Sequence, residues 1–216
     1  MIFHILTTFP QYFESPLLSS IVHRAIANQI INVNLIDLRR FANDKHKTTD
    51  DRPFGGGAGM VMKIEPIEKA LASIAIAKPR KNRTILLSAR GKRFIQTDAH
   101  RLASYESLII ICGHYGDVDQ RVADYLVDEE ISIGDFVMTG GEPAALVMID
   151  AISRLLPNVL GNETSAIAES HDKPGMPSPP SYTRPADHHG WKVPEVLLSG
   201  NVAAINAWKA DYLDSK

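Results

Sequence analysis

The sequence contains only one cysteine among 216 residues, so no disulfide can form within the chain. Cys112 ends an apolar run, and we interpret it as a small core residue rather than a nucleophile. No apolar run approaches the roughly 20 residues of a membrane helix. The first residues, MIFHILTTFP, have neither a basic start nor a small-residue cleavage site. We therefore expect a cytoplasmic protein, in a reducing compartment, with no membrane segment.

Net charge is also small. A formal charge of -2 with 44% apolar residues predicts one well-buried core and room for a small appendage. An acidic balance does not favour nucleic-acid binding, because phosphates are held by clustered cations. Basic residues nevertheless concentrate at 45–47, 78–83 and 90–93, while carboxylates gather between 124 and 135. Each cluster could be a solvated loop, but three together favour a basic patch.

Two common nucleotide-binding motifs are missing. A P-loop needs Lys and then Ser or Thr after its last glycine, and here Gly59 is followed by Met60, Val61 and Met62. The dinucleotide fingerprint fails as well, because Met62 stands where its third glycine belongs. Both absences argue against a standard phosphate-cradling or Rossmann site.

Glycine-rich loops, in contrast, follow two apolar strands. CGHYGDVDQR (112–121) follows the run at 108–111, and ISIGDFVMTGGE (131–142) leads into an apolar helical pattern. A third cluster has four glycines at 55–59. Each loop could be a simple turn. Together they predict bare backbone that approaches a ligand, at the strand ends where open α/β sheets bind ligands.

Strands and helices alternate along the chain. We predict strands at 2–7, 33–38, 84–87, 108–111 and 129–133, and helices at 17–29, 66–76, 97–104, 118–126 and 141–155. This order is typical of a parallel sheet. Residues 161–185 contain five prolines and little apolar periodicity, so we predict a loop that is either a linker or a lid.

Five motifs carry a resemblance to a known family: DDRPFGGGAGMVMK (50–63), CGHYGDVDQR (112–121), SIGDFVMTGGE (132–142), SYTRP (181–185) and VPEVLLSGN (193–201). In this order and spacing, the chain from Met1 to about Trp208 closely resembles the bacterial tRNA (guanine-N1)-methyltransferases, knotted methyltransferases of the SPOUT class. The resemblance implies methylation of N1 of the guanosine immediately 3′ to the tRNA anticodon.

The implied fold is α/β, with a mostly parallel sheet, helices on both faces and a deep C-terminal trefoil knot, an exception to the rule that connections do not thread loops. We predict the knotted domain at 1–160, a lid or linker at 161–185, and at 186–216 the start of a shortened or truncated helical domain that binds tRNA. The resemblance also implies a homodimer whose active site lies at the subunit interface.

In this family S-adenosylmethionine lies bent in the knot, held by three loops. The resemblance implies that the cofactor-binding residues are Leu86, Leu87, Ser88, Gly113, Tyr115, Gly116, Val118, Ile133, Gly134, Met138, Gly140 and Gly141. The implied substrate-binding residues are Asp50, Arg52, Gly55, Gly57, Gly59, Asp119, Ser165 and Arg184. For Asp50, Arg52 and Asp119, an Asp–Arg pair that tethers two loops is an equal alternative.

Methylation of guanine N1 needs a general base, because N1 carries a proton, and a cation near the carbonyl oxygen that gains negative charge. By position, the resemblance implies Glu169 as the base and Arg154 as the cation. The family's base is an aspartate, so Glu169 adds a methylene, and a misplacement of about 1 Å can slow a reaction roughly a hundredfold. Asp172 is a second candidate base.

Gly116 and Asp117 are a second difference, because many members have Glu followed by Gly there. The family's activity implies Mg²⁺, but the carboxylate is displaced by one residue and we assign no metal ligands. Two alternatives stay open. One is a knotted protein that binds S-adenosylmethionine or RNA with weakened catalysis. The other is a related SPOUT methyltransferase that acts on ribosomal RNA.

Overall fold

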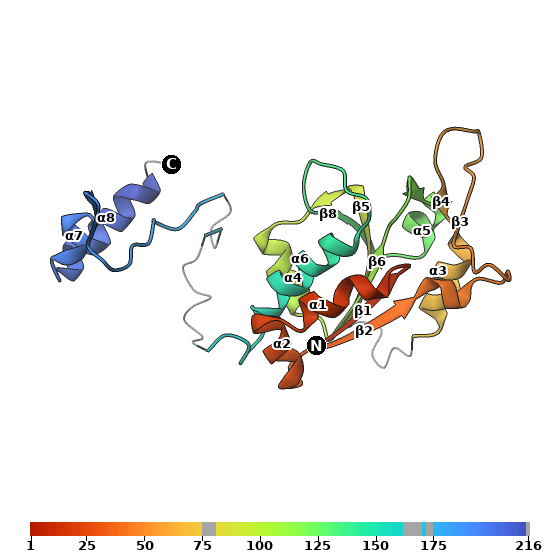
Figure 1. The fold of residues 1–216 in the computed structure, drawn as a ribbon, viewed down its shortest axis with the longest axis horizontal. Helices are drawn as coiled ribbons and strands as arrows, with labels where there is room; N and C mark the ends of the chain where they lie inside the picture. Colours follow the sequence, from red (N-terminus) through yellow and green to blue (C-terminus); the bar gives the residue numbers. More distant parts are fainter. Residues whose placement is uncertain (75–80, 162–169, 172–174, 215–216) are drawn as a thin grey trace. The chain divides into compact units, whose positions relative to one another are not determined.

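The computed structural model describes residues 1–74, 81–161, 170–171 and 175–214 (Figure 1). The chain divides into two compact units, Met1–Glu163 and Thr164–Lys216. The finer division predicted above, with a lid at 161–185, stays a prediction. In the described part of the chain, no helix has both the length and the apolar character that crossing a membrane demands.

A five-stranded sheet forms the centre of the first unit (Figure 1). Its strands are β1 (Ile2–Thr7), β2 (Asn32–Asp37), β5 (Asn82–Arg93), β6 (Ser107–Cys112) and β8 (Glu129–Ser132). Their order is β2-β1-β6-β5-β8, and every pairing is parallel. The predicted parallel sheet is therefore confirmed. Because the strands share one direction, the loops that follow their carboxyl ends gather at one edge.

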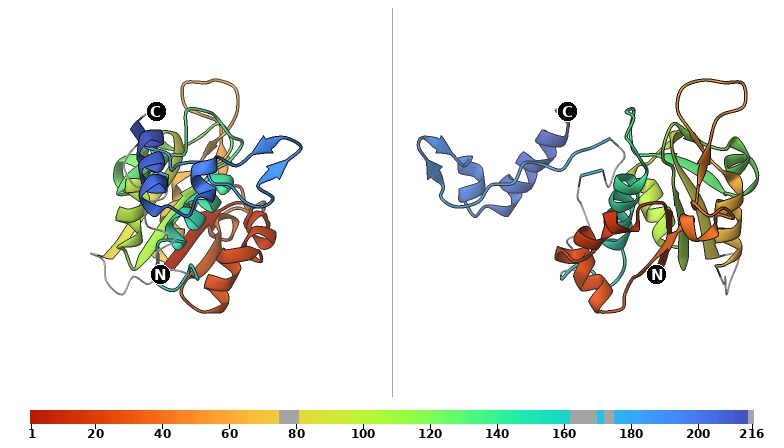
Figure 2. Two further views of the ribbon diagram at one scale, coloured as in Figure 1. Left: turned by 90° about the vertical axis from the view of Figure 1, so that its left-hand side faces the viewer. Right: turned by 45° about the vertical axis from the view of Figure 1, so that its right-hand side comes forward.

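Helices cover both faces of this sheet, as Figures 1 and 2 show. One face carries η1 (Pro10–Phe13), α1 (Glu14–Leu17), α2 (Ser20–Ala27), α4 (Gln96–Ala103) and α6 (Glu142–Ser153). The other carries η2 (Leu38–Phe41), α3 (Ile64–Ala72) and α5 (Gln120–Tyr125). The predicted helices on both faces are confirmed.

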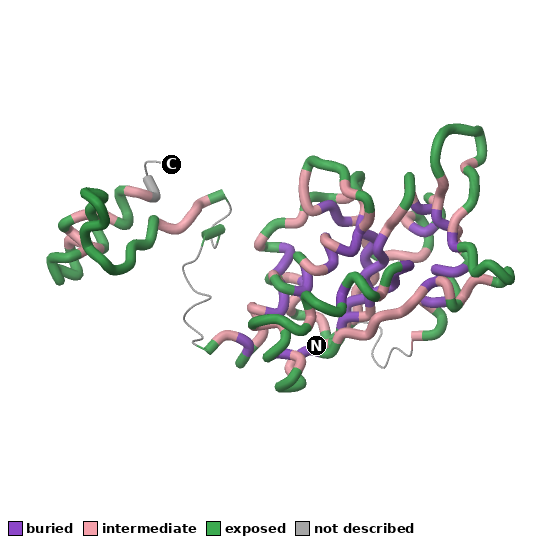
Figure 3. The backbone as a smooth tube through the Cα atoms, in the orientation of Figure 1, coloured by how far each residue is buried: buried purple, intermediate pink, exposed green. Residues whose placement is uncertain are grey.

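The continuous apolar run of β6 follows from this double cover. Successive residues of a strand point to opposite faces, so Leu108 and Ile110 enter one core and Ile109 and Ile111 the other. A strand that is buried on both sides cannot alternate with polar residues. In Figure 3 the buried backbone runs through the middle of the unit, and the exposed backbone lies in the peripheral loops.

A second, three-stranded sheet was not predicted. It pairs β3 (Asp50–Asp51) antiparallel with β4 (Val61–Met62), and β4 parallel with β7 (Asp117–Val118). The loop between β3 and β4, which contains the predicted glycine cluster, extends away from the sheet (Figures 1 and 2). The Gly116 N–H donates to the Met60 carbonyl at 2.9 Å. The glycine loop is thereby joined to the loop after β6.

Two predicted elements differ in extent. The helix expected at 17–29 corresponds to α2 and is shorter, because the chain leaves helical conformation after Leu17 and α2 begins at Ser20, which has a φ of 54°. The strand expected at 84–87 continues to Arg93, and its register against β8 shifts between Leu87 and Lys92. The intervening residues bulge from the carboxyl edge of the sheet.

The second unit contains a short hairpin and two helices. The hairpin pairs β9 (Asp187–His188) antiparallel with β10 (Trp191–Lys192), and α7 (Glu195–Leu198) and α8 (Val202–Asp214) follow. Both helices lie within 186–216, and the helical domain predicted there stays a prediction. Its tRNA-binding role stays a prediction.

Candidate functional site

A cavity of about 270 Å³ opens at the carboxyl edge of the main sheet. Its walls come from three segments: 87–90 in β5, 113–118 after β6, and residues between 131 and 144 around the β8–α6 connection. The volume is near the lower end of ligand pockets, which span roughly 300–1,000 Å³. The three loops predicted from sequence therefore do meet around one space.

Most of the residues predicted to bind a cofactor lie in these walls. Ten of them line the cavity: Leu87, Ser88, Gly113, Tyr115, Gly116, Val118, Ile133, Met138, Gly140 and Gly141. Leu86 does not, because its side chain is buried in the core on the α3 face. Gly134 does not line the cavity either, and it packs against the ring of Phe136, which does. Cofactor binding stays a prediction for all twelve residues.

The second and third loops are held together by their backbones. The Gly141 N–H donates to the Gly113 carbonyl at 2.7 Å, and His114 bridges Gly140 in antiparallel fashion. A Cβ atom on Gly140 would lie 2.3 Å from both His114 Nδ1 and Glu142 Oε2. Glycine is therefore required here by the protein's own groups, and not only by the approach of a ligand.

An aromatic cluster lies beside the cavity. The His114 ring lies 4.6 Å from the Phe9 ring and 5.1 Å from the Tyr115 ring, centroid to centroid. The Arg39 guanidinium lies 5.7 Å from the Phe9 ring centroid, and its Nη2 lies 3.5 Å from the Tyr115 hydroxyl. Tyr115 has a φ of 64°, a conformation that bulky residues rarely adopt. Aromatic and guanidinium faces of this kind can stack on nucleobases.

The displaced carboxylate of Asp117 forms an ion pair. Arg90 Nη2 lies 3.1 Å from Asp117 Oδ2, so the pair joins the first loop to the second at the cavity wall. Among the described residues, no group of three or more His, Cys, Asp or Glu side chains is arranged to hold a metal ion. The Mg²⁺ requirement implied by the resemblance stays a prediction.

Asp119 has a local partner. Its carboxylate caps α5 by accepting the Arg121 N–H at 3.0 Å, and it pairs with the Arg121 guanidinium at 2.6 Å. This side-chain hydrogen bond lowers the pKa of Asp119. The Asp–Arg pair considered for Asp119 therefore exists within one helix end, and not between two loops. Asp50 lies in β3, and Arg52 is exposed just after that strand.

The glycine cluster between β3 and β4 needs glycine for its backbone path. Gly55, Gly56, Gly57 and Gly59 have φ values of 85, 79, 122 and 93°. Only glycine adopts such angles without strain. Beyond the immediately adjacent residues, no atom of the described chain lies within 4 Å of the place where their Cβ atoms would be. The loop therefore presents open backbone, and its predicted contact with tRNA stays untested.

Arg154 lies at the far end of α6 from the cavity. The helix begins next to Gly141, which lines the cavity, and Arg154 is its C-terminal cap. At 1.5 Å per residue, the two ends are about 18 Å apart. The other predicted catalytic residue, Glu169, lies outside the described residues, as do Ser165 and Asp172. Arg184 is exposed in the second unit, where it precedes a cis proline.

The basic clusters are partly neutralised by nearby carboxylates. Arg90, Lys92 and Arg93 pair with Asp117, Asp98 and Asp135. Lys81 pairs with Glu106, and Arg83 pairs with Asp128 and Glu129. Residues 78–80 lie outside the described chain. These pairs weaken the argument for a continuous basic patch, which stays a prediction.

Cys112 is completely buried at the end of β6. Burial raises the pKa of its thiol well above the ordinary value, and the nearby Glu142 raises it further. A protonated, inaccessible thiol is a poor nucleophile. The interpretation of Cys112 as a core residue is therefore confirmed.

Some residues at the cavity were not named individually from the sequence, although the loops 113–118 and 133–141 were expected to hold the cofactor. His114, Arg90, Ser132, Phe136 and Thr139 line it, and Glu142 is buried next to it. The sequence signal was present for His114, because it stands between two predicted contact residues in CGHYGD. Burial of the Glu142 carboxylate had no such signal, since acidic residues at the start of a helix are usually exposed.

Comparisons with a family model and with individual proteins identify the same family. All of the chain, residues 1–216, matches the family model of the tRNA (Guanine-1)-methyltransferase TrmD. It is 50% identical over 205 residues to the tRNA (guanine-N(1)-)-methyltransferase of Dehalococcoides mccartyi strain CBDB1, covering 95% of this chain and 82% of that protein. The protein of the same name from Carboxydothermus hydrogenoformans is 52% identical, with 95% and 79% coverage. That from Geotalea uraniireducens is 51% identical, with 97% and 84% coverage.

Proposed function

The chain belongs to the tRNA (guanine-1)-methyltransferase TrmD family, and we infer that it is a tRNA (guanine-N1)-methyltransferase. Its target is N1 of the guanosine immediately 3′ to the anticodon. One structural observation carries this proposal: three loops that are far apart in sequence form one cavity at the carboxyl edge of a parallel sheet. The chain is about 50% identical to relatives that are named tRNA methyltransferases, and this favours tRNA over ribosomal RNA as the substrate.

S-adenosylmethionine is the donor that we propose for this cavity. The residues fit it, because Leu87, Ile133 and Met138 offer apolar walls to an adenine ring. Backbone groups at Gly113 and Gly140 can hydrogen-bond to its polar edge. When bound, this cofactor supplies the methyl group.

Guanine must lose the N1 proton to become nucleophilic. We propose that the Glu169 carboxylate accepts this proton, and that the Arg154 guanidinium stabilises the negative charge that develops on the carbonyl oxygen. Arginine suits this role because it stays charged and presents several N–H donors. The additional methylene of Glu169, relative to aspartate, makes the position of its backbone decisive for the rate.

We also propose that the enzyme is a homodimer. Arg154 lies about 15 Å along α6 from Ala144, the last residue of this helix that lines the cavity of its own subunit, and we take this as too far for contact with a guanine held there. In a two-fold dimer, Arg154 of one subunit would face the cavity of the other. We propose that the segment that carries Glu169 also acts at the cavity of the other subunit, as a lid.

We also propose that the fold contains the trefoil knot that the resemblance implies. Two close contacts support it. A Cβ on Gly91 would meet the Ile131 backbone at 2.5 Å, and Gly141 is bonded to Gly113. The end of β5 therefore lies directly against β8, and the loop after β6 is hydrogen-bonded to the loop after β8. We propose that the threaded connection is formed where these segments meet.

Recognition of tRNA is proposed for the residues that the resemblance implies. These are Asp50, Arg52 and the glycine loop in the first unit, Asp119 beside α5, and Ser165 and Arg184 further along the chain. A cytoplasmic location follows from this substrate, and it stays a prediction together with the Mg²⁺ requirement.

Methyl transfer tests the proposed function. Tritium from labelled S-adenosylmethionine should be incorporated into a tRNA transcript that carries guanosine after the anticodon, and not into one that carries adenosine there. A ribosomal RNA fragment serves as a competitor. Loss of signal in Glu169→Ala and in Arg154→Ala supports the assigned roles. No transfer by the unaltered protein, with retained binding of S-adenosylhomocysteine, would instead support a binding protein with weakened catalysis.

A further inference from the structure

A buried carboxylate lies next to the cavity and has no role in the mechanism above. Glu142 is the first residue of α6, and only 2% of its surface is exposed. The hydroxyl of Thr7, at the end of β1, donates to Glu142 Oε1 at 2.7 Å. This bond joins residues 135 positions apart in sequence.

The second oxygen of this carboxylate faces the cavity loops. Glu142 Oε2 lies 3.5 Å from His114 Nδ1, a buried nitrogen with no hydrogen bond among the described residues. Both atoms also lie against the backbone of Gly140, as the 2.3 Å distances to its hypothetical Cβ show. One carboxylate therefore contacts the end of β1, the second loop and the third loop.

Burial of a charged group costs free energy, so the burial of the Glu142 carboxylate calls for an explanation. The N-terminus of α6 and the Thr7 hydroxyl offset part of the cost. A neutral apolar residue would avoid the cost altogether. It would, however, leave the His114 imidazole and the Gly140 backbone without a polar group to set their separation.

We propose that Glu142 is a positioning residue for the cofactor site. Its carboxylate fixes His114 and Gly140, so that the second and third loops keep their spacing across the cavity. The inference rests on the proposed function, because the loops are taken to hold S-adenosylmethionine. Glu142 itself does not contact the reacting atoms.

Three substitutions separate positioning from a general effect of charge on stability. Glu142→Ala removes both contacts. Glu142→Gln keeps the length and the oxygen that accepts from Thr7, and offers an amide toward His114. Glu65→Ala is the matched control, because Glu65 is also an acidic residue in the first turn of a helix, α3, but is exposed and distant in sequence from the cavity loops.

The measurements are the Kd for S-adenosylhomocysteine by calorimetry and the separate KM values for S-adenosylmethionine and tRNA. Glu142→Ala should raise the Kd and the cofactor KM about tenfold, equivalent to roughly 1.4 kcal/mol, and leave the KM for tRNA within about twofold. Glu142→Gln should recover binding to within about threefold of the unaltered protein. Glu65→Ala should bind as the unaltered protein does.

Several results would overturn the proposal. They are unchanged cofactor binding in Glu142→Ala, a loss in Glu142→Gln as large as in Glu142→Ala, or an equal rise in both KM values. If Glu142→Ala does not fold, Glu142→Asp takes its place, since the shorter side chain cannot span both contacts and should show the same tenfold loss. Failure of the unaltered protein to bind S-adenosylhomocysteine would instead overturn the proposed function itself.

Discussion

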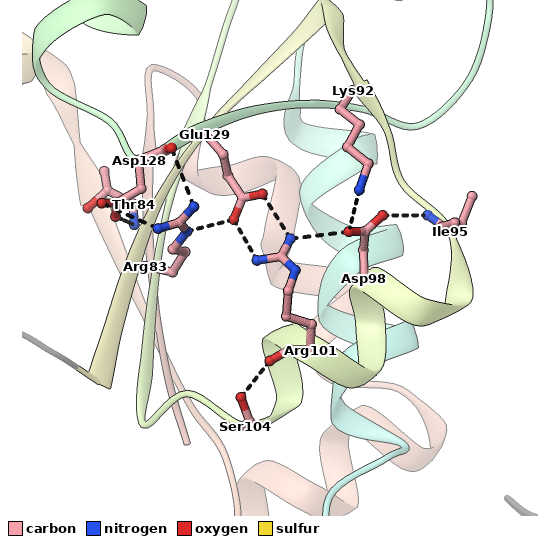
Figure 4. A network of polar contacts seen from close by, with 9 residues as sticks. All are labelled: Arg83, Thr84, Lys92, Ile95, Asp98, Arg101, Ser104, Asp128 and Glu129. Carbon is pink, nitrogen blue, oxygen red and sulfur yellow. Dashed lines mark hydrogen bonds and ion pairs between the residues drawn. The ribbon is translucent and has the colours of Figure 1, made fainter.

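Removal of the Arg101 guanidinium should destabilise the protein in a pH-dependent way. Arg101, in α4, is the centre of a network of charged side chains on β5, β8 and α4 (Figure 4). Its two terminal nitrogens lie 3.0 and 2.8 Å from the two carboxylate oxygens of Glu129, and one of them also lies 3.2 Å from Asp98. Arg83 and Lys92 complete the network.

The magnitude follows from the burial of the two carboxylates. The side chains of Glu129 and Asp98 are only 17% and 6% exposed, so this network lies between a surface ion pair and a buried one. Surface pairs contribute about 0–1 kcal/mol, and breaking a buried pair costs about 3–5 kcal/mol. Because Arg83 and Lys92 remain as partners, Arg101→Met should lower the free energy of unfolding by about 2 kcal/mol. This corresponds to a Tm lower by roughly 4–8 °C.

The sign of the pH dependence is fixed by the carboxylates. Burial would raise the pKa of Glu129 and of Asp98, but hydrogen bonds from Arg101, Arg83 and Lys92 outweigh it, so both pKa values lie below the ordinary 4.5 and 3.8. A lowered folded-state pKa contributes stability above the ordinary pKa, and this is lost as the pH falls through the folded value. The difference between the unaltered protein and Arg101→Met should therefore be full at pH 7 and shrink below about pH 4.5.

Urea unfolding from pH 7 to pH 3 provides the assay. The matched control is Arg93→Met, because the side chains of Arg93 and its partner Asp135 are 64% and 89% exposed. This control should change stability by less than about 0.5 kcal/mol. Equal effects of the two substitutions, or a difference that does not depend on pH, would show that the ion pairs of Arg101 do not stabilise the fold in this way.

Three further predictions concern Gly140 in the cavity wall, Arg154 and Cys112. Gly140→Ala should weaken the binding of S-adenosylhomocysteine at least about fivefold, since overpacking costs about 1–3 kcal/mol. Gly161→Ala should bind normally in calorimetry, because no described residue beyond its chain neighbours lies within 4 Å of the new methyl group. Arg154→Ala should slow tritium transfer about a hundredfold or more but keep the Kd for S-adenosylhomocysteine, and full activity would exclude its proposed role. Cys112 should react with a thiol reagent at least about a hundredfold more slowly in the folded than in the urea-unfolded protein, because its thiolate is disfavoured and covered; equal rates would contradict its burial.

The main sheet was predictable because short, continuous apolar runs indicate strands that are buried on both faces. The apolar runs of β1 and β6 need cover on both faces, and the intervening helices supply it. The strands β3, β4, β7, β9 and β10 have two residues each, too few to show any period. The extension of β5 to Arg93 was missed because the segment is charged and exposed, and only its pairing with β8 makes it a strand.

The cavity loops were predicted, but the reasons for their residues were only partly right. Glycine at 140 was expected to admit a ligand, and the structure adds that His114 and Glu142 leave no room for a Cβ. The helix predicted at 141–155 already placed Arg154 at the end opposite Gly141, but the sequence could not show that α6, which starts at Glu142, runs away from the cavity edge. Contacts such as Thr7 to Glu142 join distant positions, and no local pattern encodes them.

A crystal structure with S-adenosylhomocysteine would show whether the three loops enclose the cofactor. We expect a bent ligand enclosed by the segments 87–90, 113–118 and 131–144, with its adenine near Leu87 and Ile133. A ligand bound in an extended form at another surface, with these loops empty, would contradict it.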